Sequence, residues 1–175
     1  MEKNTNIWKN AMNWGIILGI VLIIFSLLMY FLGFSLEKWV GYINYILMIG
    51  GIIYSTIQYR DNVLDGSITY GKALGFGTLV IMFSSIITAV YAYVFYAYID
   101  PDMITKILEM AEEEMVNKGL PDEQIEMALE MQSKFMKPGL MALISLPAVT
   151  FFGFLFSLIT SIFLKKNVET SPFED

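Results

Sequence analysis

One segment of the chain has residue types and spacing close to those of a phosphate-binding loop. Residues 66–73 read GSITYGKA, which fits the P-loop pattern G-x-x-x-x-G-K-[ST] except at its last position. In a working P-loop, backbone N–H groups cradle the phosphates, the lysine reaches them and the final hydroxyl binds Mg²⁺. Here Ala73 replaces that hydroxyl, and helix-length apolar runs flank the segment where a buried strand should precede it. We therefore predict that it binds no nucleotide.

Carboxylates are the other residues whose chemistry stands out. Ten of them lie between Asp100 and Lys137, and three are consecutive in the stretch EMAEEEM. Consecutive residues fan around a helix instead of converging on an ion, and no D-x-D-x-D-G loop is present, so the sequence predicts no specific calcium or magnesium site. It also singles out no pair of carboxylates for glycosidase chemistry.

The absence of two residue types removes further classes of chemistry. The chain contains no cysteine and no histidine. It therefore has no disulfides, thiolate nucleophiles, Cys/His zinc sites or imidazole acid–base groups. We predict no catalytic, cofactor-binding or metal-binding residue and expect a protein that is not an enzyme. The acidic balance without a basic stripe also argues against nucleic acid as a partner.

Charge and hydropathy are unevenly distributed. Hydrophobic residues make up 56% of the chain and the mean hydropathy is +0.59, whereas about 45–50% apolar is usual for a soluble domain. The segment 100–137 holds ten acidic residues and four lysines, a net charge of −6, which equals the net charge of the whole chain. Seven acidic and seven basic residues balance elsewhere.

Four apolar runs are long enough to cross a bilayer. Each reaches the ~20 residues that a helix needs to span the hydrocarbon core, and none contains Asp, Glu, Lys or Arg. With four such helices in 175 residues, too little of the chain remains to shield their apolar surfaces from water. We predict an all-α membrane protein, a single membrane domain over 1–175, with the first span retained as an anchor. The predicted spans are 11–34, 39–59, 73–99 and 140–164.

Lysine and arginine favour one orientation of these spans. Six of them fall on the side of the termini and five on the other side, and the first side has the higher density. By the positive-inside rule we predict that both termini are cytoplasmic and that the acidic loop lies outside. The six are Lys3, Lys9, Arg60, Lys72, Lys165 and Lys166. Arg60, Asp61, Asp65 and Lys72 form a charged turn, which either pairs with itself and lipid headgroups or serves as a functional polar cluster.

Small and polar residues within the spans indicate how the helices pack. Pairs such as Gly15/Gly19 and Gly71/Gly75, with Gly50–Gly51, let helix backbones approach closely. We favour packing within the chain, and a homo-oligomer remains the alternative. Pro147 predicts a kink, and Tyr91, Tyr93, Tyr96 and Tyr98 predict an aromatic belt. The polar residues expected to form interhelical hydrogen bonds are Asn44, Gln58, Ser84, Ser85, Thr88, Ser145, Thr150 and Thr160.

The acidic segment 100–137 predicts an extramembrane amphipathic helical hairpin between spans three and four. Asp100 is placed to cap its first helix and Gly119 to close it, and Pro121 opens the second. Apolar residues recur at intervals of three and four, with acidic residues on the opposite faces. Six methionines either fill the inner face or form an adaptable surface for a partner. The two apolar stripes are Ile104, Ile107, Leu108, Ala111 and Met115, then Ile125, Ala128, Leu129, Gln132, Phe135 and Met136.

Three stretches of the sequence indicate a family resemblance. They are YRDNVLDGSITYGKALGFG, YIDPDM and SLITSIFLKK. With them the chain resembles a bacterial membrane family catalogued as domain of unknown function 4199. The resemblance covers nearly the whole chain and implies four membrane helices in a bacterial inner membrane, and it implies no activity.

Two functions fit these observations. The first is an integral membrane protein that works without chemistry, as an accessory or interaction subunit whose acidic, Met-rich loop meets a protein partner. The second is a small oligomeric transporter or channel. Transporters usually carry ionisable groups or broken helices inside the membrane, and this chain offers only Pro147, Gly50–Gly51 and scattered hydroxyls there.

Overall fold

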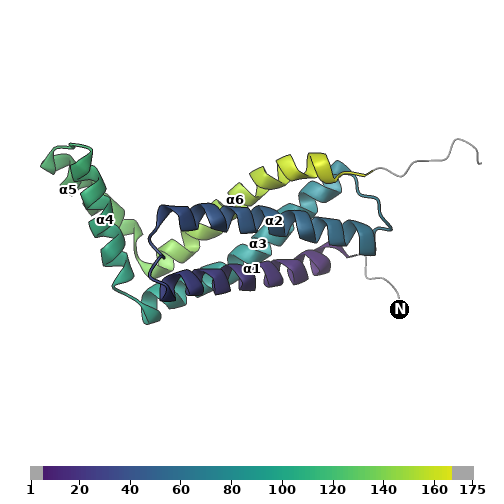
Figure 1. Cartoon of the computed structure of the whole chain (residues 1–175), viewed down its shortest axis with the longest axis horizontal. Helices are drawn as coiled ribbons and strands as arrows, with labels where there is room; N and C mark the ends of the chain where they lie inside the picture. Colours follow the sequence, from purple (N-terminus) through teal and green to yellow (C-terminus); the bar gives the residue numbers. More distant parts are fainter. Residues whose placement is uncertain (1–5, 167–175) are drawn as a thin grey trace, which may run out of the picture. The chain divides into compact units, whose positions relative to one another are not determined.

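The computed structural model describes residues 6–166, and within them the chain is helical and forms no strand. Figure 1 shows the helices in chain order. Six α-helices and one π-helical turn account for almost all of these residues. They are α1 (Ile7–Phe31), α2 (Lys38–Val63), α3 (Tyr70–Val94), η1 (Phe95–Ile99), α4 (Met103–Asn117), α5 (Asp122–Phe135) and α6 (Pro138–Leu164).

Four of these helices are long and apolar enough to span a membrane, as the sequence predicts: α1, α2, α3 continued by η1, and α6. Their ends differ from the predicted spans by a few residues, because caps rather than hydropathy decide where a helix begins. For α1 the cap is Asn6, whose side-chain oxygen accepts a hydrogen bond from the Trp8 backbone N–H at 2.9 Å. The helix therefore starts four residues before the predicted span. Lys3, which entered the orientation argument, lies outside the described residues.

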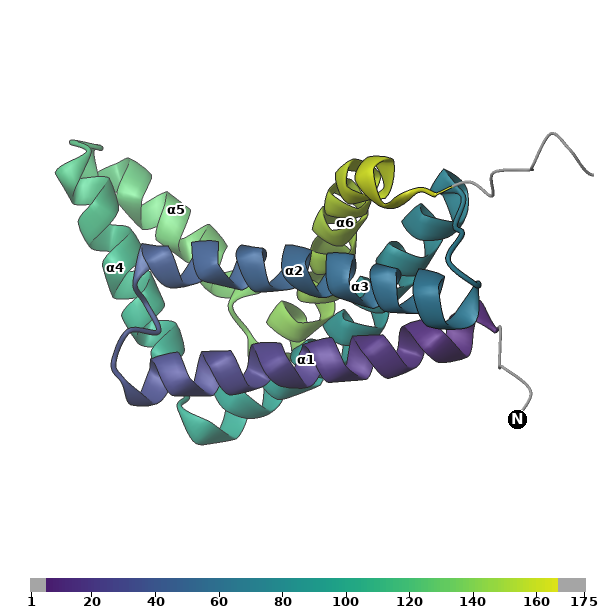
Figure 2. The same ribbon diagram turned by 45° about the vertical axis from the view of Figure 1, so that its right-hand side comes forward.

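The chain divides into two compact units, each with its own contacts. The bundle unit comprises residues 6–87 and 148–166 of the described chain, and the hairpin unit comprises residues 88–147. In the bundle unit α1, α2, the first part of α3 and the second part of α6 surround a core (Figure 2). Ile52, Phe76 and Val80 are almost completely buried there, and the rings of Tyr59 and Phe76 stack with centroids 4.2 Å apart.

Close backbone approach holds the bundle unit together. A Cβ added at Gly15 would lie 2.7 Å from the carbonyl oxygen of Val80, and one at Gly19 would lie 3.2 Å from the Ile87 Cβ. These contacts confirm that this GxxxG pair packs α1 against α3 of the same chain. At Gly71 and Gly75 an added Cβ would meet nothing within 4 Å. The second predicted pair therefore packs against no helix of the described chain.

The contact between α3 and α6 is a ladder of small residues. An added Cβ at Gly77 would lie 2.6 Å from the Ser157 hydroxyl, and one at Gly153 would clash with Ile81. One turn further along α3, the hydroxyls of Ser85 and Thr150 share a hydrogen bond at 3.3 Å. Residue numbers rise along α3 as they fall along α6, so the two helices are antiparallel. Small residues at every turn let their backbones come this close.

In the hairpin unit, α4 and α5 pack side by side. Gly119, with φ +73°, ends α4, and the amide of Leu120 donates to the Met115 carbonyl oxygen at 3.2 Å, closing a Schellman motif. The predicted role of Asp100 is wrong: it ends η1, and α4 begins three residues later after Asp102. The Asp100 carboxylate, almost buried, instead pairs with Lys106 at 3.3 Å. The boundary between the two units follows directly after Pro147.

Candidate functional site

The segment that resembles a P-loop forms the turn between α2 and α3. Asp65 and Gly66 have φ angles of +53° and +85°, a left-handed pair for which Asp and Gly are suited. Ile68 and Ala73 are buried against the bundle. The amide and carbonyl of Ile68 exchange hydrogen bonds with those of Lys166 at 2.8 and 2.9 Å. The segment therefore joins two helices, and its backbone pairs with the chain that leaves α6.

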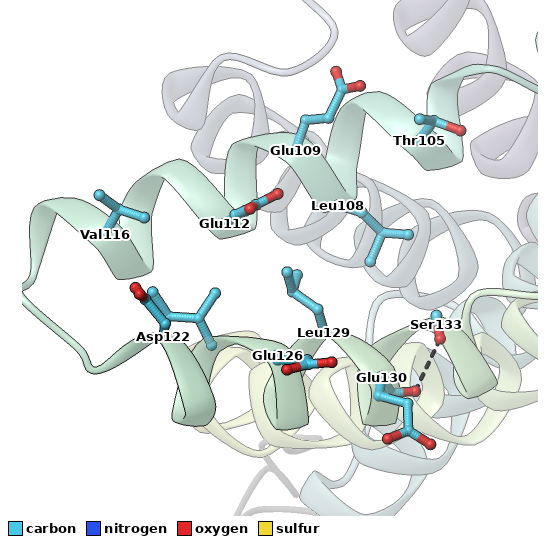
Figure 3. A pocket seen from close by; sticks show the side chains of 11 residues that line it. Thr105, Leu108, Glu109, Glu112, Val116, Asp122, Glu126, Leu129, Glu130 and Ser133 are labelled. Carbon is cyan, nitrogen blue, oxygen red and sulfur yellow. Dashed lines mark hydrogen bonds between the residues drawn. The ribbon is translucent and has the colours of Figure 1, made fainter.

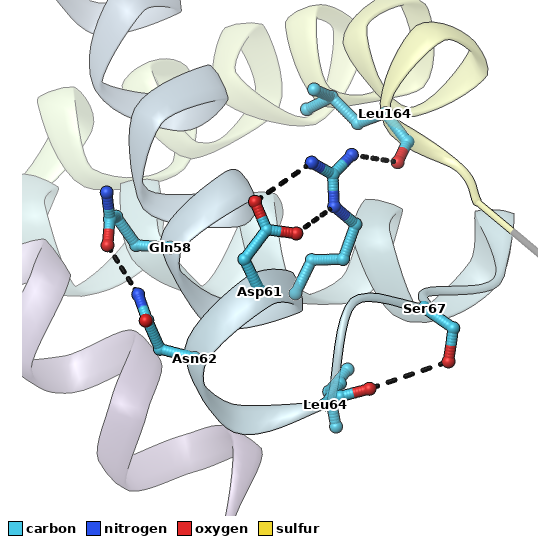
Figure 4. A network of polar contacts seen from close by, with 7 residues as sticks. Gln58, Asp61, Asn62, Leu64, Ser67 and Leu164 are labelled. Atoms are coloured by element: carbon cyan, nitrogen blue, oxygen red, sulfur yellow. Dashed lines mark hydrogen bonds and ion pairs between the residues drawn. The ribbon is translucent and has the colours of Figure 1, made fainter.

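Arg60 ties the same two regions together through its side chain. Its guanidinium donates to the Asp61 carboxylate at 2.6 and 3.1 Å and to the Leu164 carbonyl oxygen at 3.2 Å (Figure 4). Leu164 ends α6, where carbonyl groups lack intrahelical partners. We call Arg60 together with the paired Ile68 and Lys166 the clasp. Of the predicted charged cluster, Arg60 and Asp61 meet, whereas Lys72 is exposed in the first turn of α3.

Buried polar side chains in the bundle unit are all hydroxyls. They lie on α2, α3 and α6, on the faces that these helices turn inward. We call this group the hydroxyl seam. Neutral hydroxyls can be buried without the desolvation cost of a charge, provided that they find a hydrogen-bond partner. The members of the seam are Ser55, Thr56, Ser84, Ser85, Ser157, Thr160 and Ser161.

Several hydroxyls in the spans bond to their own helix, and for Ser145 and Thr160 this corrects the prediction that they bridge helices. Ser55 donates to the Ile52 carbonyl oxygen at 3.1 Å, and Thr160 donates to that of Phe156 at 3.0 Å. Thr78 and Ser145 make similar bonds three or four residues back. A carbonyl oxygen has a second lone pair, so the nearest turn of the same helix offers an acceptor without the need for a neighbouring helix. The Ser85–Thr150 pair does bridge two helices.

Two members of the hydroxyl seam have no hydrogen-bond partner within residues 6–166. They are the side-chain oxygens of Thr56 and Ser157, and both residues are completely buried. A buried hydroxyl without a partner costs about 1–3 kcal/mol in protein mutational data. Ser157 lies against Gly77, which in turn faces Ile52, one turn of α2 from Thr56. The two unpaired groups therefore belong to the same α2–α3–α6 contact.

Sequence reasoning missed four of the seven members of this seam. Ser55, Thr56, Ser157 and Ser161 were not among the polar residues assigned a role. The available signal was spacing: Ser157 and Ser161 are four residues apart and follow Gly153 by four, so all three share one face of α6. Asn44, which was assigned a role, is exposed. Gln58 accepts a hydrogen bond from Asn62 of its own helix at 2.6 Å.

The tyrosine cluster divides between exposed and half-buried positions. Tyr93 and Tyr98 are 42% and 72% exposed, as expected of belt residues. Tyr91 and Tyr96 are half-buried and contact the ring of Phe95, with centroids 5.7 and 5.4 Å away. The cluster therefore presents two rings outward and packs two inward.

In the hairpin unit a groove of about 590 Å³ runs between α4 and α5 (Figure 3). Leu108 and Leu129 point into the space between the helices, and Val116 lies toward the far end. The buried Ile125 also lines the groove. Carboxylates line both sides. Glu109 and Glu112 come from α4, and Asp122, Glu126 and Glu130 come from α5. Among residues 6–166, no group of three or more carboxylates lies where it could hold a metal ion.

The methionines of the hairpin unit divide between the inner face and the surface. Met103 is buried and Met115 and Met136 are half-buried, as the packing interpretation predicts. Met110, Met127 and Met131 are 42%, 62% and 60% exposed. Phe135, predicted in the inner stripe, is 54% exposed. Met127, Met131 and Phe135 follow one another at four-residue intervals, and so they form one exposed apolar stripe along α5. We call these three residues the α5 stripe.

Comparison with known proteins gives the chain a family. A family model described as "Protein of unknown function (DUF4199)" matches residues 13–166. The chain belongs to this family. The match runs from within α1 to the last residue of the clasp, and so it includes both segments that the clasp joins, the α2–α3 turn and the end of α6. No curated protein and no solved structure matches the chain. The family's description names no activity, so a functional argument has to come from the geometry.

Proposed function

We propose that this chain is a multi-pass protein of the bacterial inner membrane that performs no chemistry and acts as an accessory or interaction subunit. Both termini are cytoplasmic in this proposal, and the α4–α5 hairpin lies outside the membrane. The charges of α4 and α5 support that placement, because carboxylates on both sides of the pair would be costly in hydrocarbon. The four apolar helices support the membrane location.

The observation that carries the proposal is the α5 stripe. Met127, Met131 and Phe135 each expose more than half of their surface on a helix that already buries Ile125 against α4. The apolar surface of α5 is therefore wider than the part that α4 covers. Methionine side chains are unbranched and polarizable, and they adapt to a protein surface. An exposed apolar stripe beside acidic residues is typical of a protein-binding surface.

The test is site-specific photo-crosslinking in cells of the protein's own host. A photoreactive residue at Met127 or Met131 should give one discrete protein adduct. The separate variant Phe135→Ser, combined with the photoreactive group at Met131, should weaken that adduct severalfold. A group at exposed Glu113 is the matched control and should give none. Adducts with lipid alone would contradict the proposal.

Native mass spectrometry of gently extracted complexes is the independent readout. A companion protein in fixed stoichiometry would support an accessory subunit. A homo-oligomer that carries a small solute and no companion would instead support the alternative, a small oligomeric transporter or channel.

A further inference from the structure

The groove between α4 and α5 has the composition of a peptide-binding site. Its floor is apolar, formed by Leu108 and Val116 of α4 and Ile125 and Leu129 of α5. Its volume of about 590 Å³ falls within the roughly 300–1,000 Å³ of pockets that bind ligands. An open apolar floor gains stability when a partner's side chains cover it.

The rims of the groove carry charge of one sign. Asp122, Glu126 and Glu130 are spaced four residues apart, so they form a row along α5. Glu109 and Glu112, three residues apart, line the groove from α4. No lysine or arginine lines the groove. Like charges on two facing rims repel each other, and a cationic ligand between them would relieve that repulsion.

The rim carboxylates are largely available to a ligand. Within residues 6–166, Glu130 is the one member of the five that forms an ion pair, with Lys134 at 2.8 Å. Both partners of that pair are more than 65% exposed, and exposed pairs contribute only about 0–1 kcal/mol. Exchange of Lys134 for a ligand's cation would therefore cost little.

We propose that this groove binds a cationic amphipathic segment of a partner protein. Lysine or arginine side chains of the segment lie on the two carboxylate rims, and its apolar side chains cover the floor. Along α4 the groove extends from Thr105 to Val116, and at 1.5 Å per residue that is about 16 Å. A segment of about three helical turns fits this length. The inference rests on the proposed function and specifies the chemistry of the partner.

The experiment measures the binding of a defined peptide to the full chain in phosphatidylcholine nanodiscs. The probe is a fluorescein-labelled amphipathic peptide of leucine and lysine, about 11 residues long to match the groove. The same peptide with glutamate for lysine is the charge control, and empty nanodiscs give the lipid background. We expect saturable binding of the lysine peptide, weakening with added salt because the ion pairs are exposed.

Two triple variants with the same change in net charge distinguish binding by the groove from general attraction to a negatively charged protein. Glu109→Gln, Glu112→Gln, Glu126→Gln removes rim charges. Glu113→Gln, Glu114→Gln, Glu123→Gln removes charges from the same two helices outside the groove. For the rim variant we expect about a tenfold loss of affinity, as the loss of three exposed ion pairs would produce. For the variant outside the groove we expect a loss of less than about threefold. Val116→Ser, at a groove residue that is 56% exposed, should weaken binding without a loss of helical content.

Three results would overturn the inference: equal losses in the two triple variants, equal binding of the glutamate peptide, or no binding above that of empty nanodiscs. The photo-crosslinking experiment distinguishes failure of this inference from failure of the proposed function. If adducts at Met131 form while the peptide does not bind, the hairpin meets a partner by another surface. If both fail, the proposed function fails as well.

Discussion

The bundle unit and the α4–α5 pair use polar residues in opposite ways. The bundle unit buries seven small hydroxyls and satisfies several of them with carbonyl oxygens of their own helices. The α4–α5 pair keeps its carboxylates at the surface, around a groove, and leaves apolar side chains exposed. Buried hydroxyls therefore serve the packing of the bundle unit itself, whereas the exposed carboxylates and apolar side chains of α4 and α5 are the surface that we propose meets a partner.

Gly15→Ala should destabilise the bundle most. The new Cβ would lie 2.5 Å from the Phe83 Cβ and 2.7 Å from a backbone oxygen, so the helices must separate, at a cost of about 2 kcal/mol. Gly75→Ala is the matched control, because nothing lies within 4 Å of its added Cβ. It should be neutral or stabilising by up to about 1 kcal/mol. Unfolding by SDS titration in mixed micelles measures both, and equal effects would contradict the assigned packing.

Arg60→Ala should open the clasp. The variant loses the pair with Asp61 and the hydrogen bond to the Leu164 carbonyl oxygen, and we expect a loss of about 1.5 kcal/mol. Arg60→Lys should recover only part of this, since an ammonium group lacks the planar fork that serves both partners. Hydrogen exchange at the amides of Ile68 and Lys166 should become faster. Lys72→Ala, at an exposed position, should leave both the stability and the exchange rates unchanged.

Substitutions within the hydroxyl seam should have opposite signs. Thr56→Val keeps the shape of the side chain and removes a buried hydroxyl that has no partner, so it should raise the free energy of unfolding by about 1 kcal/mol. Ser85→Ala removes a hydrogen bond between helices and should lower the free energy of unfolding by about 0.6 kcal/mol. A destabilised Thr56→Val variant would show that this hydroxyl is satisfied in the membrane.

The double substitution Met127→Ser, Met131→Ser should leave the stability almost unchanged. Both side chains are about 60% exposed, and exposed substitutions usually change the free energy of unfolding by less than about 0.5 kcal/mol. Leu129→Ser, at a half-buried position that faces α4, is the contrasting variant and should reduce the helical content seen by circular dichroism. If the double variant unfolds as readily as Leu129→Ser, the α5 stripe is part of the hairpin's own core.

Local sequence patterns were enough to predict the four apolar helices, the helix ends at Gly119 and Pro121, and the concentration of charge in 100–137. These features are local: hydropathy, turn chemistry and charge act within a few residues of one another. The tertiary structure alone decided which GxxxG pair packs, because Gly15/Gly19 and Gly71/Gly75 have the same spacing and differ only in what lies opposite. It likewise decided that Arg60 reaches Leu164, 104 positions away, and that Phe135 faces outward. Such outcomes depend on which helix lies opposite, and no local pattern encodes that.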